Sequence, residues 1–371
     1  MEKVRIESAF ILGAGFSWHA GMPLQDGFTE ALLTGRGEGT GASGKVVQFL
    51  RDFVRDAFHH SQDAHAKHWP ELEDLFTCLD LSANSGHHLG INYPPAKLRV
   101  VRRALIYRII TMLAERYSEA KNVPDDKWRH LERYLKRLDL ASSAFICTNW
   151  DTVLEARLSD LFKVGTFDYR CSAASAHFPS ENDAKIPEAA QTGAQRIPVV
   201  KMHGSTNWLY CDNCRRILWF PAEQSVRVAG QLLRKRDWEI IDPEGQREIE
   251  RYRCTRCQGD TLGTRLATFS YLKALDFPMF QKSWFSAEEI LRAAKRWVFI
   301  GYSLPAADFE FKFLLKRLQL SRHRPVSFVV ISGGSGADRA FWNYQRFFGR
   351  AIKKDETFFD LGLSDKRLRT H

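Results

Sequence analysis

Short apolar runs alternate with longer segments of helical periodicity along much of the chain. Ala9 to Leu12 form the first run and end at Gly13, which is the pattern of a buried parallel strand. Four further runs are equally short, apolar and bounded by small or polar residues. They cover residues 143–148, 197–202, 297–301 and 326–332. We expect all five to be strands.

Apolar residues recur at helical spacing between these runs. The segments with this pattern are 46–58, 72–79, 98–113, 128–138, 287–295 and 308–318. Strands that alternate with helices predict an α/β fold with a parallel sheet.

Two insertions interrupt this alternation. Residues 30–140 are expected to form a mostly helical module, and residues 205–262 carry paired cysteines. Within the first insertion, the glycine-rich stretch Gly35–Gly44 predicts a mobile loop. The length of 371 residues allows one large domain or two ordinary ones. We expect a single catalytic domain over residues 1–371 that contains both insertions.

Composition narrows the class of protein. Apolar residues make up 44% and charged residues 26%, which excludes a disordered, collagen-like or coiled-coil chain. No apolar run reaches the roughly 18 residues of a membrane span, and Met1 to Arg5 begin no signal peptide, so we expect a soluble cytoplasmic protein with no membrane partner. The net charge of +10 permits contact with nucleic acid, but a solvated basic surface explains it equally well, and no motif supports direct nucleic-acid binding.

Four of the seven cysteines form two pairs with metal-ligand spacing. Cys211-x-x-Cys214 and Cys254-x-x-Cys257 can together form a tetrahedral four-thiolate zinc site. Four protein ligands leave the metal no open position, so the role of Zn²⁺ is expected to be structural. The wide spacing between the pairs predicts an intervening β-ribbon, and the alternative is four reduced, unligated thiols.

Small and polar residues follow the first strand. In Gly13-Ala14-Gly15-Phe16-Ser17, the glycines would let the backbone approach a pyrophosphate, and the next helix would supply N–H donors. An ordinary tight strand–helix turn is the alternative.

Polar residues also follow three later strands, where parallel sheets form their ligand crevice. In Thr148-Asn149-Trp150-Asp151, Asn149 offers a donor and an acceptor to a sugar or a water, and Asp151 could bind a ribose hydroxyl or cap the next helix. His203, within Lys201-Met202-His203-Gly204-Ser205, could be a general base or a structural histidine. Gly301-Tyr302-Ser303, followed by Asp308, places further polar groups at the crevice rim.

The order of these motifs over residues 8–335 resembles that of the sirtuin superfamily. The resemblance implies a Rossmann-like parallel sheet with a helical insertion and a small zinc-ribbon insertion, and NAD⁺ between them. Protein deacylases of this family carry Asp-Phe-Arg after the first Gly-x-Pro, and Gln-Asn-x-Asp and Gly-Thr-Ser further on. In this chain Leu24-Gln25-Asp26 follows Pro23 in place of Asp-Phe-Arg. Thr148 stands where the second motif has Gln, and Tyr302 stands where the third motif has Thr. These forms are similar to the bacterial sirtuin-like NADases of antiphage defence, which deplete NAD⁺ in infected cells.

The resemblance implies hydrolysis of NAD⁺ to nicotinamide and ADP-ribose, with particular roles for the motif residues. Asn149 would orient water or the ribose, His203 would act as general base or bind the ribose, and Asp151 would hold the nicotinamide ribose. Binding of the phosphates would fall to Gly13, Ala14, Gly15 and Ser17, and Gly301 and Ser303 would line the far side. An always-active NADase would be toxic, so the resemblance also suggests gating by homo-oligomer formation, a HerA-type hexameric ATPase or another defence partner. Two alternatives remain: an NAD-dependent protein deacylase and a non-enzymatic nucleotide-sensing module.

Overall fold

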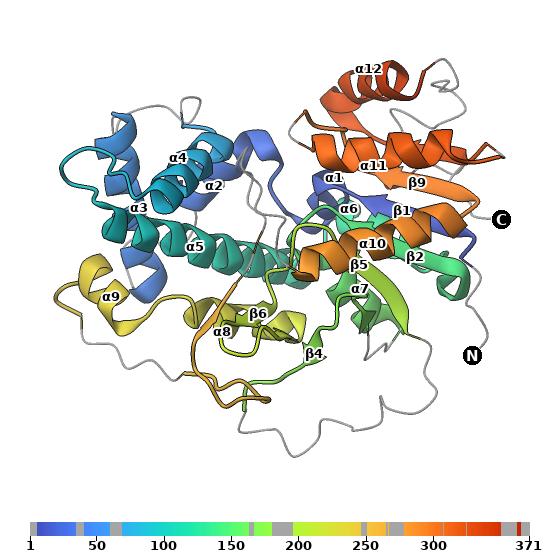
Figure 1. Cartoon of the computed structure of the whole chain (residues 1–371). Coiled ribbons are helices and arrows are strands. Elements are labelled where there is room, and N and C mark those ends of the chain that lie inside the picture. The colour runs from blue at the N-terminus through green and yellow to red at the C-terminus, as the bar shows by residue number, and fades with distance from the viewer. Residues whose placement is uncertain are drawn as a thin grey trace.

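The computed structural model describes residues 6–34, 41–59, 69–162, 167–179, 196–245, 251–264, 266, 278–306, 308–323, 325–349 and 362–364. All five predicted strands are confirmed, and they lie in one six-stranded parallel sheet (Figure 1). The sheet contains β1 (Ser8–Leu12), β2 (Ser143–Cys147), β3 (Phe167–Asp168), β5 (Ile197–Lys201), β9 (Arg296–Ile300) and β10 (Ser327–Ile331), in the order β10-β9-β1-β2-β5-β3. The predicted α/β fold class is therefore confirmed.

The register of the sheet brings the ends of its central strands to one edge. Leu12 pairs with Cys147 on one side and with Ile300 on the other, and Cys147 pairs with Lys201. The chain passes from β1 to β2 on one side and later returns to place β9 on the other side. Such a topological switch point is where parallel sheets form their ligand crevice.

Alternate residues of the strands face two separate cores, as the two-residue period of a strand requires. Ala9 and Ile11 pack against α10 (Pro278–Ala293), α11 (Phe309–Leu320) and α12 (Ala337–Phe348). Phe10 and Leu12 face the opposite core, which includes α6 (Asp126–Leu135) and α7 (Val153–Phe162). Burial on both faces explains why the strands read as continuous apolar runs.

Four helices between β1 and β2 form a module beside the sheet (Figure 1). They are α2 (Phe28–Thr34), α3 (Gly41–Phe58), α4 (Leu72–Ser85) and α5 (Pro95–Asn122), whereas α1 (Ala14–Ser17) directly follows β1 and α6 precedes β2. The helix α3 begins inside the glycine-rich stretch that was expected to be a loop, so that expectation is wrong for residues 41–44, and residues 35–40 lie outside the described part of the chain. Packing offsets the low helix propensity of glycine here, because Gly44 is buried and Ser43 accepts a hydrogen bond from Arg108 of α5 at 3.3 Å.

The cysteine-bearing insertion is only partly a β structure. A second sheet has the order β4-β7-β6-β8 and consists of β4 (Ala174–Ser175), β6 (Trp208–Cys211), β7 (Ile217–Trp219) and β8 (Leu262–Gly263). The predicted β-ribbon between the cysteine pairs is therefore wrong in part, because β7 is followed by the helices α8 (Ser225–Gly230) and α9 (Lys235–Ile241). These helices pack on α5, whose Arg103 donates hydrogen bonds of 2.6 and 3.1 Å to the Asp237 carboxylate of α9.

Short 3₁₀ helices complete the described elements: η1 (Trp18–Ala20), η2 (Gln25–Gly27), η4 (Leu140–Ser142), η7 (Ala222–Gln224), η8 (Gly334–Gly336) and η9 (Gly362–Ser364). Among the helices of the described ranges, we find none that combines the length and the apolar character of a membrane span.

Candidate active site

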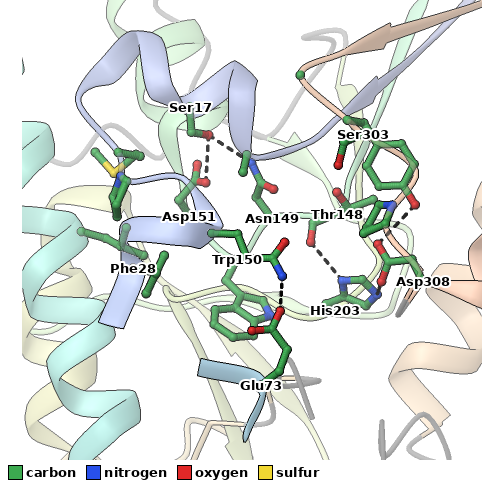
Figure 2. A pocket seen from close by; sticks show the side chains of 18 residues that line it. Ser17, Phe28, Glu73, Thr148, Asn149, Trp150, Asp151, His203, Ser303 and Asp308 are labelled. Carbon is green, nitrogen blue, oxygen red and sulfur yellow. Dashed lines mark hydrogen bonds and ion pairs between the residues drawn. The ribbon is translucent and has the colours of Figure 1, made fainter. Parts of the chain in front are cut away.

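The loops that follow β1, β2, β5 and β9 line one cavity at the switch point of the sheet (Figure 2). It encloses about 980 Å³ of empty space, including space that opens to solvent. The strand-end loops contribute Ala14, Ser17, Thr148, Asn149, Trp150, Asp151, His203, Gly301, Tyr302, Ser303, Pro305 and Asp308. Seven of the nine residues that the sequence predicted for catalysis or nucleotide binding are in this set.

The other two, Gly13 and Gly15, lie behind the cavity wall and pack against the loop after β9. The Gly15 N–H donates to the carbonyl of Gly301 at 3.0 Å. A Cβ atom on Gly13 would lie 2.5 Å from the Gly301 oxygen, and one on Gly15 would lie 2.7 Å from the Gly301 Cα. Gly301 itself has a φ of +60°, which favours glycine. Close approach of two backbone segments therefore accounts for these glycines.

A chain of hydrogen bonds fixes the side chain of Asn149 (Figure 2). The Ser17 hydroxyl donates its only proton to the Asp151 carboxylate at 2.8 Å. Its oxygen can then only accept, so the group that faces it at 3.2 Å must be the Asn149 NH₂. The amide oxygen of Asn149 is consequently left as the acceptor that it can offer to a ligand.

The Asp151 carboxylate caps the next helix, which is one of the two interpretations that the sequence left open, and it also binds Ser17. One oxygen accepts from the backbone N–H of Val153 at 3.0 Å, at the start of α7, and the other accepts from Ser17. Asp151 therefore holds the helix start and the orientation of Asn149 at the same time. Direct contact of Asp151 with a ribose remains a prediction.

The tautomer of His203 follows from its partner. Its Nδ1 lies 2.9 Å from the backbone carbonyl oxygen of Thr148, which can only accept, so Nδ1 carries the proton. In the neutral imidazole, Nε2 is then the atom with the lone pair, as a general base requires. The residue is 6% exposed and lines the cavity.

Asp308, which the sequence placed only among the polar groups at the crevice rim, lies next to this histidine. Its Oδ1 is 3.9 Å from Nε2 of His203, and its Oδ2 accepts from the Tyr302 hydroxyl at 3.2 Å (Figure 2). Burial, together with the Asp308 carboxylate, raises the pKa of Tyr302 well above its usual value, which keeps the phenol protonated as a donor.

The helical module also contributes to the cavity, and sequence reasoning missed this contribution. Glu73 of α4 lines the cavity and accepts a hydrogen bond from Gln25 of η2, beside Phe28 of α2. Burial raises the pKa of Glu73. A signal was present, because Glu73 shares a helix face with Phe76, and an acidic side chain on a buried face is uncommon.

The cavity is acidic although the chain as a whole is basic. The described residues that line it include three with a carboxyl group, Glu73, Asp151 and Asp308, and one histidine, His203. None of these lining residues is a Lys or an Arg. The chain has a net charge of +10. The cavity is therefore suited to a ligand group that carries positive charge.

A buried ion pair supports the floor of the site. Lys201, the last residue of β5, is 1% exposed, and its Nζ lies 3.4 Å from Oε1 of Glu155 in α7. Burial by itself lowers the pKa of Lys201, but the Glu155 carboxylate raises it, so the ammonium remains charged. Its Nζ also donates to the backbone carbonyl of Asp151, which fixes the loop after β2.

The four paired cysteines form one cluster in the second sheet. The sulfur atoms of Cys211, Cys214, Cys254 and Cys257 all lie within 4.8 Å of one another, and neighbouring pairs are 3.5 and 3.6 Å apart. Tetrahedral zinc with Zn–S bonds of about 2.3 Å places its sulfurs about 3.8 Å apart. Backbone N–H groups also bond the sulfurs, those of Asn213 and Cys214 to Cys211 and those of Arg256 and Cys257 to Cys254. These residues fit a structural Zn²⁺ ion, as the spacing predicted.

Comparison with known proteins gives distant structural matches only. No protein-family model matches the chain, and no curated protein matches it. One solved structure, described as "The Structural basis for Sirtuin Substrate affinity", is 12% identical, with 88% of this chain and 81% of that chain covered and a TM-score of 0.29. Another, of Sir2 in complex with the inhibitor EX-527, 2'-O-acetyl-ADP-ribose and a deacetylated p53 peptide, is 13% identical, with 92% and 93% covered and a TM-score of 0.30. At these scores the matches carry no argument about this chain.

Proposed function

We propose that this protein hydrolyses NAD⁺ at the bond between nicotinamide and ribose. The observation that carries the proposal is the convergence of four motifs on one acidic cavity at the switch point of the sheet. The nicotinamide ring of NAD⁺ is cationic, and its departure leaves positive charge on the ribose in an oxocarbenium-like transition state. Carboxylates that face such a centre stabilise the charge as it develops.

Different residues of the cavity serve different steps of this reaction. Asn149, with its amide fixed by Ser17, holds a ribose hydroxyl or the water through its oxygen. His203 accepts a proton at Nε2. The C1′–N bond breaks with its electron pair going to the ring nitrogen, so nicotinamide leaves neutral. Water then forms the new C1′–O bond and releases one proton, which gives ADP-ribose. Ala14, Ser17, Gly301 and Ser303 border the rest of the dinucleotide.

The motif forms also support a more specific proposal. Thr148 before Asn149 and Tyr302 after Gly301 favour the sirtuin-like hydrolases of antiphage defence over the deacylases. We therefore propose that the chain is a single catalytic domain with two insertions and that it acts by depleting NAD⁺. Such an enzyme requires gating, which we assign to self-assembly or to a defence partner such as a HerA-type ATPase.

One observation favours a second candidate function, NAD-dependent protein deacylation. The four-cysteine cluster is typical of sirtuin deacylases, and the same His203 and cavity would serve that reaction. Formation of O-acetyl-ADP-ribose from NAD⁺ and an acetylated peptide would identify a deacylase. ADP-ribose formed without any acyl acceptor would identify the hydrolase.

The test is chromatography of the products formed from NAD⁺ by wild type, Asn149→Ala and His203→Ala. We expect the wild type to release equal amounts of nicotinamide and ADP-ribose. Each variant should lose about 100-fold or more, which is typical when a general base or a fixed polar group is removed.

The matched control is His88→Ala, which removes an exposed histidine outside the cavity. It should keep wild-type turnover. Full NAD⁺ cleavage by either active-site variant would contradict the assignment.

A further inference from the structure

Asp308 occupies a position where an aspartate normally caps a helix, but its side chain does something else. It precedes the first residue of α11, Phe309, and makes no side-chain hydrogen bond to the N–H groups of that helix. An aspartate at this position usually accepts such a bond. Here the side chain is only 11% exposed, and its carboxylate lies between Tyr302 and His203.

The distance between Asp308 and His203 indicates a shared small ligand. The 3.9 Å from Oδ1 to Nε2 is too long for a hydrogen bond, but one oxygen atom about 2.8 Å from each would bond both. The Thr148 carbonyl accepts from Nδ1 of His203, so the lone pair of the neutral ring is on Nε2. The Tyr302 hydroxyl donates to Oδ2 of Asp308 and holds the carboxylate in place. Nε2 and Oδ1 therefore belong to side chains that are each held at their other polar atom, and both residues line the cavity.

We propose that Asp308 and His203 together hold the water that attacks the ribose. This inference rests on the proposed hydrolysis of NAD⁺ and adds Asp308 as a catalytic residue. Water donates one hydrogen bond to each acceptor, which directs a lone pair of its oxygen at C1′. As the C1′–O bond forms and nicotinamide leaves with the C1′–N electron pair, one water proton passes to this pair of acceptors and from there to solvent.

The exchange of labelled nicotinamide into NAD⁺ distinguishes a loss of water activation from a general loss of activity at the site. An enzyme that breaks the C1′–N bond can rejoin ADP-ribosyl with labelled nicotinamide, and that reaction needs no water. We expect Asp308→Asn to lower the hydrolysis of NAD⁺ by about 10- to 100-fold, the usual range for lost base assistance. Incorporation of labelled nicotinamide into NAD⁺ should stay within about threefold of wild type, so the ratio of exchange to hydrolysis rises.

A second variant and a control complete the test. Tyr302→Phe removes only the donor to Asp308 and should raise the same ratio by a smaller factor. Asp126→Asn makes the same chemical change at an exposed position of α6 and should change neither reaction. Thermal unfolding of each variant checks that it folds.

Each other outcome excludes part of the proposal. Unchanged hydrolysis in Asp308→Asn would overturn the role of Asp308. An equal loss of hydrolysis and exchange would also overturn it, since Asp308 would then act on bond cleavage or on folding. Absence of both reactions from the wild type, tested both in its assembled form and with a HerA-type ATPase added, would instead remove the proposed function, and this inference with it.

Discussion

Ser17 decides which end of the Asn149 amide faces the cavity. Its hydroxyl gives its proton to Asp151 and so can accept only from an N–H group. An amide with its oxygen toward Ser17 would place two acceptors against each other. One small side chain on α1 thus sets the chemistry that a residue after β2 can offer.

Ser17→Ala should therefore affect activity more than stability. The substitution leaves Asn149 and Asp151 each without one partner, which costs about 1–3 kcal/mol in the free energy of unfolding. The freed amide can rotate, and we expect NAD⁺ turnover to fall by about 10- to 100-fold. Steady-state kinetics and urea unfolding measure the two effects.

Ser85→Ala is the matched control for this prediction. Ser85 is exposed and bonds only the carbonyl of Leu81 in its own helix among its described contacts. Its loss should leave turnover as it is. Wild-type turnover in Ser17→Ala would contradict the role given to the serine.

At the scale of residues, the sequence located much of the candidate site because parallel strand ends meet at one edge. Asn149, His203 and Ser303 all follow strands, and they line the same cavity. Glu73 and Gln25 come from the helical module, and no strand-end rule applies to them. The sequence placed Asp308 only among the polar groups at the crevice rim and gave no sign that its carboxylate lies next to His203.

At the scale of elements, the four-cysteine cluster and the loop that carries His203 are joined through β6. Only four residues separate His203 from Trp208, where β6 begins, and β6 ends at Cys211. Between them, the N–H of Thr206 donates to the Trp150 carbonyl at 2.9 Å, and the Asn207 side chain donates to the Phe220 carbonyl at 2.6 Å. The small sheet therefore anchors the loop that carries His203.

Cys254→Ser should remove the metal and loosen this anchor. We expect the wild type to hold about one Zn²⁺ per chain and the variant to hold much less, since a hydroxyl replaces a thiolate ligand. Structural zinc contributes to folding free energy, so the unfolding temperature should drop by about 5 °C or more. Elemental analysis and thermal unfolding measure both quantities.

Cys78→Ser provides the comparison, because Cys78 is a half-buried cysteine of α4 outside the cluster. Its zinc content should equal that of the wild type. If Cys254→Ser also retains its zinc, the four-thiolate site is refuted.

Helices and strands were predictable from the sequence where the spacing of apolar residues, or an unbroken apolar run, extends over enough positions. The strands β1, β2, β5, β9 and β10 have five residues each, and α3, α4 and α5 repeat their apolar positions over several turns. By contrast, β3, β4 and β8 have two residues each, too few to show a pattern. The helices α8 and α9 are short, and they are held by contacts with α5 that no local pattern encodes.

At the scale of the whole molecule, the loops that follow two neighbouring central strands of the parallel sheet meet in a contact between glycines. Gly15 follows β1 and Gly301 follows β9, so 285 residues of the sequence lie between them. A Cβ atom on Gly301 would lie 2.3 Å from the carbonyl carbon of Gly15. The helices α2, α3, α4 and α5, the four-cysteine cluster and most of the cavity belong to the chain between these two residues.

Alanine at either glycine should destabilise the fold by pushing apart the same two backbone segments. We expect Gly15→Ala to cost about 1–3 kcal/mol in the free energy of unfolding, and Gly301→Ala more, because its positive φ adds strain. Gly230→Ala is the control, since a Cβ there meets nothing within 4 Å. Urea unfolding provides the free energies.

The shared contact has a consequence for how the chain can vary. Once one alanine has separated the segments, the second meets a gap that is already open, so the double variant should cost less than the sum of the single ones. Additive costs would show that the glycines act independently. If the two costs are coupled, Gly15 and Gly301 are constrained as a pair during evolution. A larger residue at one of the two positions is then better tolerated in a chain where the other position has already changed.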